Sequence, residues 1–293
     1  MPSPLLSIIL PNFNEGVRLR QTIASLAQTT RAPYEVIVVD NGCSDGSSDF
    51  LLENIDERIT LIREPQRLGV VGARHRGAAH ASGDVLVFAD AHLIFPPNWD
   101  QPMLEALGLP GVALVGPAVC NIGELQGPYI CGSVWANAAL DIQHLDRPAT
   151  QDSYEVAAAC GGCQMITREQ FQLTPYDAGM VDWGMEDHEI CVRLWMLGKV
   201  VRVVPSVLVQ HHFREFVSYA RWENVTYNKL RAVFAHLGPA RVTRCVGAIA
   251  AEPGFEEAFS RLQVSDIFDR RAALDEIRVF DDEWFFRRFR LGF

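Results

Sequence analysis

Residues 35–47 read EVIVVDNGCSDGS, an apolar, β-branched run followed directly by carboxylates, amides and glycines. Three other short apolar runs have the same character: Leu6–Leu10, Ile59–Arg63 and Val85–Ala89. Each of the four is too short and too β-branched to favour a helix, so all four predict strands. Helix-compatible spacing fills the intervals, at Val17–Thr29, Ser47–Glu53 and Gly69–Ala81. Strands that alternate with helices at this interval predict an α/β fold with a mostly parallel sheet flanked by helices.

Polar side chains follow the four predicted strands at the point where each strand ends. They are Asn12, Asn14 and Glu15 after the first strand, Asp40, Asn41 and Asp45 after the second, Arg67 after the third, and Asp90 and His92 after the fourth. Ligands of such sheets bind at the carboxyl ends of the strands, so we expect these side chains to share one crevice. Polar turn residues follow strands in many proteins, and the inference therefore depends on all four loops together.

The triplet Asp90-Ala91-His92 predicts a metal site. Residues two apart in an extended segment point the same way, so the carboxylate and the imidazole can face one cation. An Asp oxygen and a His nitrogen suit a borderline divalent ion such as Mn²⁺, with Mg²⁺ as the alternative. His211-His212 offers a third ligand, and we expect only His211 to reach the ion because neighbours on an extended chain face opposite sides. Arg214 can add charge-assisted hydrogen bonds to phosphate oxygens held there.

The loop Asp40–Gly46 predicts a nucleoside contact. Carboxylate and amide oxygens accept hydrogen bonds from a pyrimidine N–H or from ribose hydroxyls, and glycines allow a close backbone approach. A helix N-cap at Asp45 or Ser47 is the structural alternative, and both roles are compatible. Neither a G-x-G-x-x-G sequence nor a P-loop follows the first predicted strand, which argues against a dinucleotide oxidoreductase.

Glu186-Asp187 opens a predicted helix, Met185–Leu197, that ends at Gly198. The helix macrodipole stabilises a carboxylate in the first turn, so an ionised base aimed at an acceptor hydroxyl or thiol is physically reasonable. Acidic residues at a helix start are also good caps, and this structural role is the competing interpretation.

The segment Cys160-Gly161-Gly162-Cys163 contains two glycines between two cysteines. We expect Gly161 and Gly162 to let the backbone lie close to a sugar. A single C-x-x-C without further ligands is poor evidence for zinc or redox chemistry.

The motifs, taken in order, resemble the nucleotide-sugar domain of family 2 glycosyltransferases with the GT-A fold. The matching segments are Ile8–Glu15, Val38–Ser47, Leu68–Gly69 with Ala73, Arg74 and Gly77, then Gly83–Asp84 and Asp90. The resemblance covers roughly residues 6–214 and implies a Rossmann-like GT-A catalytic domain over 1–214. Its nucleotide-sugar half is expected at about 1–110 and its acceptor half at about 111–214. Residues 215–293 are expected to form a C-terminal helical extension.

The resemblance also implies roles for individual residues. The donor-binding residues it implies are Pro11, Asn14 and Glu15 in the nucleotide pocket, Asp40 at the uracil, and Arg67 and Arg74 near the donor. Asp90 and His92 take the place of the D-x-D metal motif. Glu186-Asp187 is similar to the family's E-D motif, in which the aspartate usually serves as the base of an inverting transfer.

Two features depart from the usual family pattern. The D-x-H triplet, with WGME at 183–186 and HHFR at 211–214, resembles the polypeptide N-acetylgalactosaminyltransferases. Those enzymes retain anomeric configuration and use a histidine at the position of His211 as a metal ligand. Asparagine commonly follows the glutamate in them, whereas this chain has Asp187. Because Asp187 supplies the base that inversion requires, the sequence favours inversion, with a retaining transfer to a peptide as the alternative.

Composition limits the setting in which such an enzyme would work. The chain of 293 residues is 48% hydrophobic, which suits one compact unit. Its net charge of -10 repels polyanions, so we expect no nucleic-acid partner. Seven cysteines predict mostly reduced thiols, and with no signal-like N-terminus they predict a soluble, cytoplasmic protein. The aromatic-basic tail Trp284–Phe289 is compatible with a homodimer contact, an acceptor-site lid or a membrane-surface anchor, but we expect it to pack within the fold.

We therefore expect a metal-dependent transfer from a UDP-sugar to a hydroxyl or thiol of a peptide, a glycan or a small metabolite. A sugar nucleotidyltransferase is a competing enzyme class, but it normally carries a Gly-rich basic phosphate loop near its first strand, where this chain is acidic. A non-catalytic nucleotide-sugar-binding protein is the further alternative.

Overall fold

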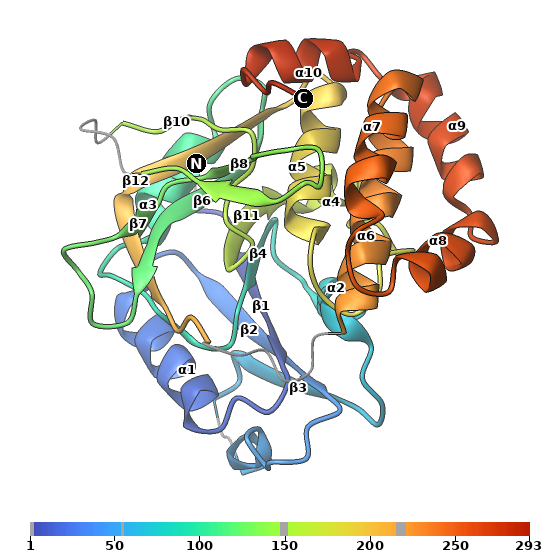
Figure 1. The fold of residues 1–293 in the computed structure, drawn as a ribbon. Coiled ribbons are helices and arrows are strands. Elements are labelled where there is room, and N and C mark those ends of the chain that lie inside the picture. The colour runs from blue at the N-terminus through green and yellow to red at the C-terminus, as the bar shows by residue number, and fades with distance from the viewer. Residues whose placement is uncertain (1–2, 54–55, 147–151, 215–220) are drawn as a thin grey trace.

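The structure, a computed structural model, describes residues 3–53, 56–146, 152–214 and 221–293. In these residues a ten-stranded sheet runs in the order β10-β12-β6-β11-β4-β1-β2-β3, with β5 beside β12 and β7 beside β6. Helices cover both faces of the sheet, and the C-terminal helices stack beside α5 on one side of the molecule (Figure 1). This arrangement is an α/β fold with a helical extension, as the sequence predicts.

The parallel half of the sheet forms where the four apolar runs predict it. Its strands are β1 (Leu6–Asn12), β2 (Tyr34–Asn41), β3 (Ile59–Glu64) and β4 (Val85–Ala89), joined through α1 (Val17–Thr29), the 3₁₀ turn η1 (Asp49–Leu51) and α2 (Gly69–His80). Successive β1 side chains enter opposite cores, because Ile8 and Leu10 pack with α1 while Ile9 packs with α2. Burial on both faces explains the continuous apolar runs of β1, β2 and β4, whereas the edge strand β3 is only partly buried.

The predicted helix Ser47–Glu53 is wrong, since only the short turn η1 forms there. The Ser48 hydroxyl donates to the Asp40 carboxylate, and the Ser47 backbone N–H donates to Oδ1 of Asp45 at 2.9 Å. Such local bonds between side chains and backbone compete with helical hydrogen bonds, and they keep this segment in a loop.

The second half of the sheet is mixed, while most strands of the main sheet run parallel, as the sequence predicts. Its main strands are β6 (Val112–Asn121), β11 (Cys163–Thr167) and β12 (Val200–His211), and β11 runs antiparallel to both β4 and β6. β12 continues through Pro205, where the pairing with β6 shifts register between Val204 and Leu208. A proline is tolerated where a ladder is locally interrupted.

Eight further strands and helices complete the part of the fold before α6. They are β5 (Leu93–Ile94), β7 (Tyr129–Ile130), β8 (Ser133–Trp135), β9 (Ile142–His144), β10 (Tyr154–Glu155), α3 (Asp100–Leu107), α4 (Arg168–Leu173) and α5 (Glu186–Met196). The β-like run Tyr129–Trp135 is therefore split, with β7 in the main sheet and β8 paired to β9 in a second, two-stranded sheet. Gly132, with φ of +92°, makes the break between them.

Five helices follow β12 in the described residues. They are α6 (Trp222–His236), α7 (Pro239–Ile249), α8 (Phe255–Gln263), α9 (Ile267–Ile277) and α10 (Asp282–Arg288). The aromatic tail packs inward as expected, since Phe285 and Phe286 are buried and Phe285 meets Trp135 edge to face at 6.0 Å. The division at residue 214 stays a prediction, and residues 215–220 lie outside the described part of the chain.

Buried charges fasten the extension to α5 and to the loop before it. Asp177 is 1% exposed and accepts two hydrogen bonds from Arg231 of α6, at 2.7 and 2.9 Å. On α5, Glu189 lies 2.9 Å from Arg193 and 3.0 Å from Arg270 of α9. Pairs of this kind tolerate little rearrangement, because either partner left alone would be an uncompensated buried charge.

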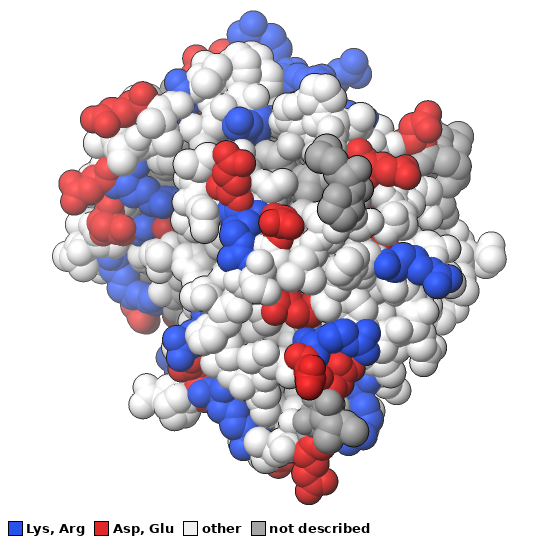
Figure 2. All heavy atoms as spheres, turned by 180° about the vertical axis from the view of Figure 1, so that it is seen from behind, with Lys and Arg blue, Asp and Glu red and all other residues white. Residues whose placement is uncertain are grey.

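The surface carries both signs of charge. Acidic and basic side chains are interspersed over the face in Figure 2, in keeping with a modest net negative charge spread over the whole protein. Among the described residues, no helix is both long and apolar enough to cross a membrane.

Replacing Asp177 with alanine should lower the free energy of unfolding by about 3–5 kcal/mol, because it removes a buried carboxylate shared by two arginines. Urea or thermal denaturation measures the change. The control is Asp275→Ala on α9, whose side chain is 47% exposed and pairs with Arg271 at the surface, and it should cost less than about 1 kcal/mol. Equal losses in the two variants would contradict a structural role for the buried cluster.

Candidate active site and metal centre

A cavity of about 720 Å³ opens at the carboxyl ends of β1 and β4 and at the end of β12. It is lined by most of the residues that the sequence singles out: Pro11, Glu15, Arg67, Arg74, Asp90, His92, Gly161, Gly162, Glu186, Asp187, His211 and Arg214. The crevice expected from the four polar loops therefore exists, and it also receives the start of α5.

Asp90, His92 and His211 form the one compact group of ligand type found among the described residues, with one ligand atom from each lying within 4.8 Å of the others. The Nε2 atom of His211 lies 3.2 Å from Oδ2 of Asp90 and 3.2 Å from Nε2 of His92. Backbone pairing of His211 with Leu93 sets this geometry, since it joins the end of β12 to β5 beside His92. One carboxylate and two imidazoles form a donor set that fits a divalent cation such as Mn²⁺.

Glu15 and Arg214 surround the histidine side of this cluster. Oε1 of Glu15 lies 3.0 Å from Nδ1 of His92, and it also accepts from the Arg214 guanidinium. Burial alone would raise the pKa of Glu15, but its contacts with His92 and Arg214 outweigh burial and lower that pKa. An ionised carboxylate at Nδ1 favours the tautomer of His92 whose Nε2 lone pair is free for a metal.

The same balance operates at Asp90. Burial would raise the pKa of this carboxyl, but the hydrogen bond from His211 and the nearby charges of His92 and Arg74 lower it. The carboxylate is therefore held ionised, which is the form that binds a cation.

The glycines at 161 and 162 leave space for the charged groups around them. A Cβ on Gly161 would lie 2.7 Å from Oδ2 of Asp187, and one on Gly162 would lie 3.0 Å from the His211 ring. The backbone here also accepts from the N–H of Asp90, through the Gly162 carbonyl at 2.9 Å. The sequence predicts that these glycines allow close approach to a sugar, and the structure shows close approach to Asp187 and the histidine cluster.

Arg74 and Glu186 make a buried ion pair in the cavity wall. Arg74 is 1% exposed, and its guanidinium donates to the Gly161 carbonyl at 2.8 Å and lies 3.4 Å from Oε1 of Glu186. Burial raises the pKa of Glu186 to about 7, a rise that Asp187 assists and the charge of Arg74 opposes. Glu186 also accepts from the Gly184 N–H at 2.9 Å, so its carboxyl is committed to protein contacts.

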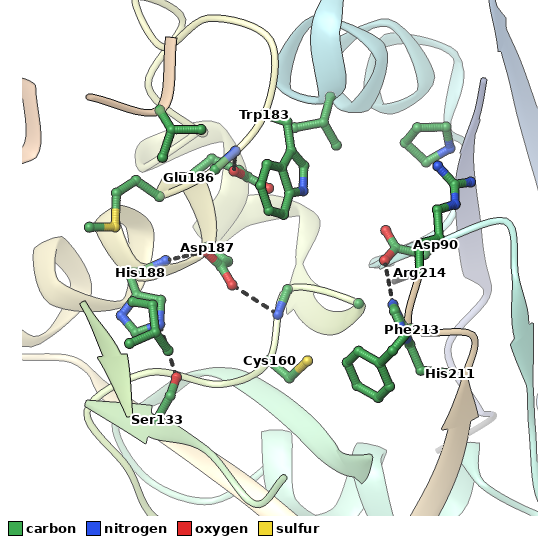
Figure 3. A pocket seen from close by; sticks show the side chains of 18 of the residues that line it. Asp90, Ser133, Cys160, Trp183, Glu186, Asp187, His188, His211, Phe213 and Arg214 are labelled. Carbon is green, nitrogen blue, oxygen red and sulfur yellow. Dashed lines mark hydrogen bonds and ion pairs between the residues drawn. The ribbon is translucent and has the colours of Figure 1, made fainter. Parts of the chain in front are cut away.

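Asp187 presents its carboxylate to the cavity. Its two oxygens accept from the backbone N–H groups of Gly161, at 3.1 Å, and His188, at 2.9 Å, which fixes the side chain while leaving it half-buried. Figure 3 shows it on the opposite side of the pocket from Asp90 and His211. Of the two predicted catalytic carboxylates, both of which line the cavity, Asp187 is the less buried.

Two predicted donor-binding residues, Asn14 and Asp40, are not among the residues that line the cavity. Oδ1 of Asn14 accepts from the Ser44 N–H at 2.8 Å, and Oδ1 of Asp40 accepts from the Cys43 N–H at 2.9 Å. Both side chains thus hold the loops after β1 and β2 in shape, and their contacts with a donor stay predictions.

The cavity lining also includes Asn41, which was expected in the crevice, and residues that the sequence did not single out for a role. Asn41 donates to the Gly69 carbonyl at 3.2 Å and accepts from the Leu68 N–H at 2.7 Å, so it fixes the start of α2. Ser133 and His188 are buried partners 2.9 Å apart in the cavity wall. The position of His188 directly after Glu186-Asp187 was the only sequence signal for this pair.

Aromatic residues form a further part of the lining. The Arg67 guanidinium stacks on Phe13 at 4.5 Å, and the Phe213 ring lies 4.2 Å from the His211 ring. Trp183 is 39% exposed and faces the pocket in Figure 3. Aromatic side chains such as these offer stacking surfaces for a base or a sugar ring.

Comparison with protein families gives two overlapping matches. Residues 7–172 match the profile described as Glycosyl transferase family 2, which is more than half of the chain. Residues 144–216 match a profile described as N-terminal domain of galactosyltransferase. The two matches together span the parallel half of the sheet, the glycines at 161 and 162, and all three candidate metal ligands.

Two curated relatives are also similar in sequence to this chain. Polypeptide N-acetylgalactosaminyltransferase 11 of Xenopus tropicalis is 30% identical over 251 residues, which cover 78% of this chain and 42% of the relative. Polypeptide N-acetylgalactosaminyltransferase 4 of Mus musculus is 32% identical over 251 residues, covering 78% and 43%. The chain thus spans less than half the length of these relatives.

Solved structures confirm the fold. The crystal structure of GalNAc-T7 with UDP, GalNAc and Mn²⁺ superposes with a TM-score of 0.80 at 21% identity, covering 97% of this chain and 56% of that one. The mannosyltransferase PcManGT from Pyrobaculum calidifontis, in complex with GDP-Man and Mn²⁺, gives 0.58 at 18% identity, covering 93% and 74%. These likenesses bear out the predicted GT-A fold.

His211→Ala should weaken Mn²⁺ binding by about tenfold or more, because it removes one of three donor atoms from the cluster. Electron paramagnetic resonance of free Mn²⁺, recorded with and without UDP, measures the affinity. His212→Ala is the matched control, since His212 lines the same cavity but lies outside the cluster, and it should bind Mn²⁺ as the wild type does. Equal weakening in both variants would place the metal elsewhere.

Proposed function

The chain belongs to glycosyl transferase family 2, and from this membership we propose that it transfers a sugar from a UDP-sugar to an acceptor hydroxyl or thiol with the help of Mn²⁺ or Mg²⁺. The observation that carries the proposal is the pairing, in one cavity, of the Asp90-His92-His211 cluster with the half-buried carboxylate of Asp187. A metal at the cluster would stabilise the negative charge that develops on the departing diphosphate.

The donor half of the proposal draws on the charges and size of the cavity. Arg67 and Arg214 line it and supply fixed positive charge for phosphate oxygens. A volume of about 720 Å³ is within the usual range for small-molecule sites. GalNAc-T7, a structural neighbour, was crystallised with UDP, GalNAc and Mn²⁺, which supports UDP as the first nucleotide to test.

The acceptor half draws on Asp187 and on the relatives. We take a peptide hydroxyl as the first acceptor to test, because curated relatives are named polypeptide N-acetylgalactosaminyltransferases. A glycan or a small metabolite is the alternative acceptor. The cavity reaches α6 and the turn before α8, where Lys229 and Glu252 line it, so the acceptor would contact the helical extension.

The proposed chemistry is an inverting transfer with Asp187 as base. Two backbone N–H groups donate to its carboxylate oxygens, and it lies in the first turn of α5, at the positive end of the helix dipole. The carboxylate would take the acceptor proton as the acceptor oxygen or sulfur attacks the anomeric carbon, while UDP departs on the metal side. A retaining, N-acetylgalactosaminyltransferase-like reaction is the alternative.

A cytoplasmic location is part of the proposal and depends on cysteine chemistry. Seven cysteines are few for a chain of 293 residues, which favours reduced thiols and a reducing compartment. A homodimer stays a prediction from the sequence.

A screen of UDP-sugars with Mn²⁺ tests the function directly, with release of UDP as the readout. We expect one or more donors to be consumed, by slow hydrolysis without acceptor and faster with a peptide acceptor, and chelation of the metal to stop both reactions. Asp90→Ala should abolish this turnover because it removes the carboxylate ligand. A non-catalytic donor-binding protein would bind UDP-sugar in the screen and release no UDP.

Asp187→Asn tests the base. The transfer rate should fall by about 10²–10⁴-fold, the usual contribution of a general base, while UDP affinity changes little. Glu283→Gln is the control, because Glu283 is a carboxylate of α10 that is 56% exposed and is not among the residues that line the cavity, and it should transfer at the wild-type rate. Turnover of the Asp187 variant at a normal rate, or a product of retained anomeric configuration by proton NMR, would exclude the inverting mechanism.

A further inference from the structure

The segment that leads into α5 has an unusual backbone. Of its residues 181–185, Asp182, Gly184 and Met185 have φ values of +56°, +99° and +75°. Left-handed conformations are rare for residues other than glycine, so two of these three need outside support to persist. The segment carries Trp183 on the cavity wall and ends directly before Glu186 and Asp187.

A single buried side chain from the helical extension supplies much of that support. Asn228 of α6 is 1% exposed, and its amide group donates to the carbonyls of Val181 and Gly184, both at 2.8 Å, and more weakly to that of Trp183 at 3.4 Å. Its Oδ1 accepts from the Val181 N–H at 2.9 Å. The whole amide is therefore used on this segment, and it spans the turn from Val181 to Gly184.

The helix that carries Asn228 is itself held in place. Arg231, one turn further along α6, makes the buried double hydrogen bond with Asp177. The opposite side of the segment is fixed to α2, because the Val70 N–H donates to the Asp182 carbonyl at 2.7 Å and Arg67 lies 2.5 Å from the Asp182 carboxylate. The segment thus lies clamped between α2, on the donor side, and Asn228.

We propose that Asn228 is a positioning residue that holds Trp183 and the first turn of α5 in the arrangement where Asp187 faces the donor. The proposal rests on the proposed glycosyl transfer, and it assigns a part in that reaction to the helical extension. Asn228 is absent from the residues that line the cavity, so it acts through the backbone that it binds. It also lies outside both matched family segments, which end at residue 216.

The test replaces Asn228 with aspartate, which has the same shape. The variant keeps one oxygen for the Val181 N–H but turns a second oxygen toward the carbonyls of Val181 and Gly184, where the amide had donated. Hydrogen exchange of the peptide covering 181–187 should become about tenfold faster or more. The kcat for UDP release should fall about 10–100-fold with less than a threefold change in donor KM, because small misplacements of reacting groups are costly in rate.

Val233→Ala is the matched control. Val233 is fully buried in the same helix, and its replacement loosens core packing, not the hydrogen bonds at 181–184. Its activity per folded molecule and its exchange at 181–187 relative to the rest of the chain should stay at the wild-type level. Asn228→Ala, which introduces no repulsive oxygen, serves as a second variant if the aspartate prevents folding.

The two hypotheses fail in different ways. Equal exchange and equal activity per folded molecule in the Asn228 and Val233 variants would overturn the positioning role while leaving glycosyl transfer intact. Failure of the wild type to consume any UDP-sugar would remove the proposed function, and the exchange measurement would still report whether Asn228 holds the segment.

Discussion

The guanidinium of Arg74 joins three parts of the chain that are far apart in sequence. It extends from α2, donates to the Gly161 carbonyl at 2.8 Å, and lies 3.4 Å from Glu186 and 3.9 Å from Asp90. An arginine that is 1% exposed needs polar partners, and these contacts supply them. The end of β4 with its candidate metal ligand, the glycine turn before β11 and the start of α5 therefore meet at this one charge.

The same charge explains why two adjacent carboxylates have different roles. Glu186 points to Arg74 and the Gly184 N–H, and it is 4% exposed, so it serves the internal network. Asp187 points the other way and keeps its carboxylate at the cavity, held by two backbone N–H groups. Successive side chains at the start of a helix diverge by about 100°, which is how an E-D pair can serve structure and chemistry at once. The sequence predicts both residues as catalytic; the structure engages Glu186 with Arg74 and the Gly184 N–H, and a catalytic role for either carboxylate stays a proposal.

Features that depend on neighbouring residues could be predicted from the sequence, whereas features that depend on contacts between distant residues could not. The four parallel strands could be predicted, and so could the choice of His211 over His212 as a candidate metal ligand, because strand pattern and side-chain alternation are local properties. The antiparallel insertion of β11 depends on pairing with β4 and β6, and no local pattern reveals it. Contacts such as Ser133 with His188, 55 positions apart, link residue types that serve many roles, so their pairing appears only in the fold.

The residues on the donor side of the cavity were easier to predict from the sequence than those on the acceptor side. The reason lies in which parts of the chain form each side. The candidate metal ligands and the glycine turn lie within the segments that the family profiles match, so sequence motifs point to them. The far end of the cavity comes from the helical extension, where Lys229 lies 2.6 Å from Glu252 and 3.1 Å from Asp141. One ammonium between two carboxylates leaves an excess of negative charge there. Under the proposed reaction this end receives the acceptor, so acceptor choice would depend on residues outside the matched segments.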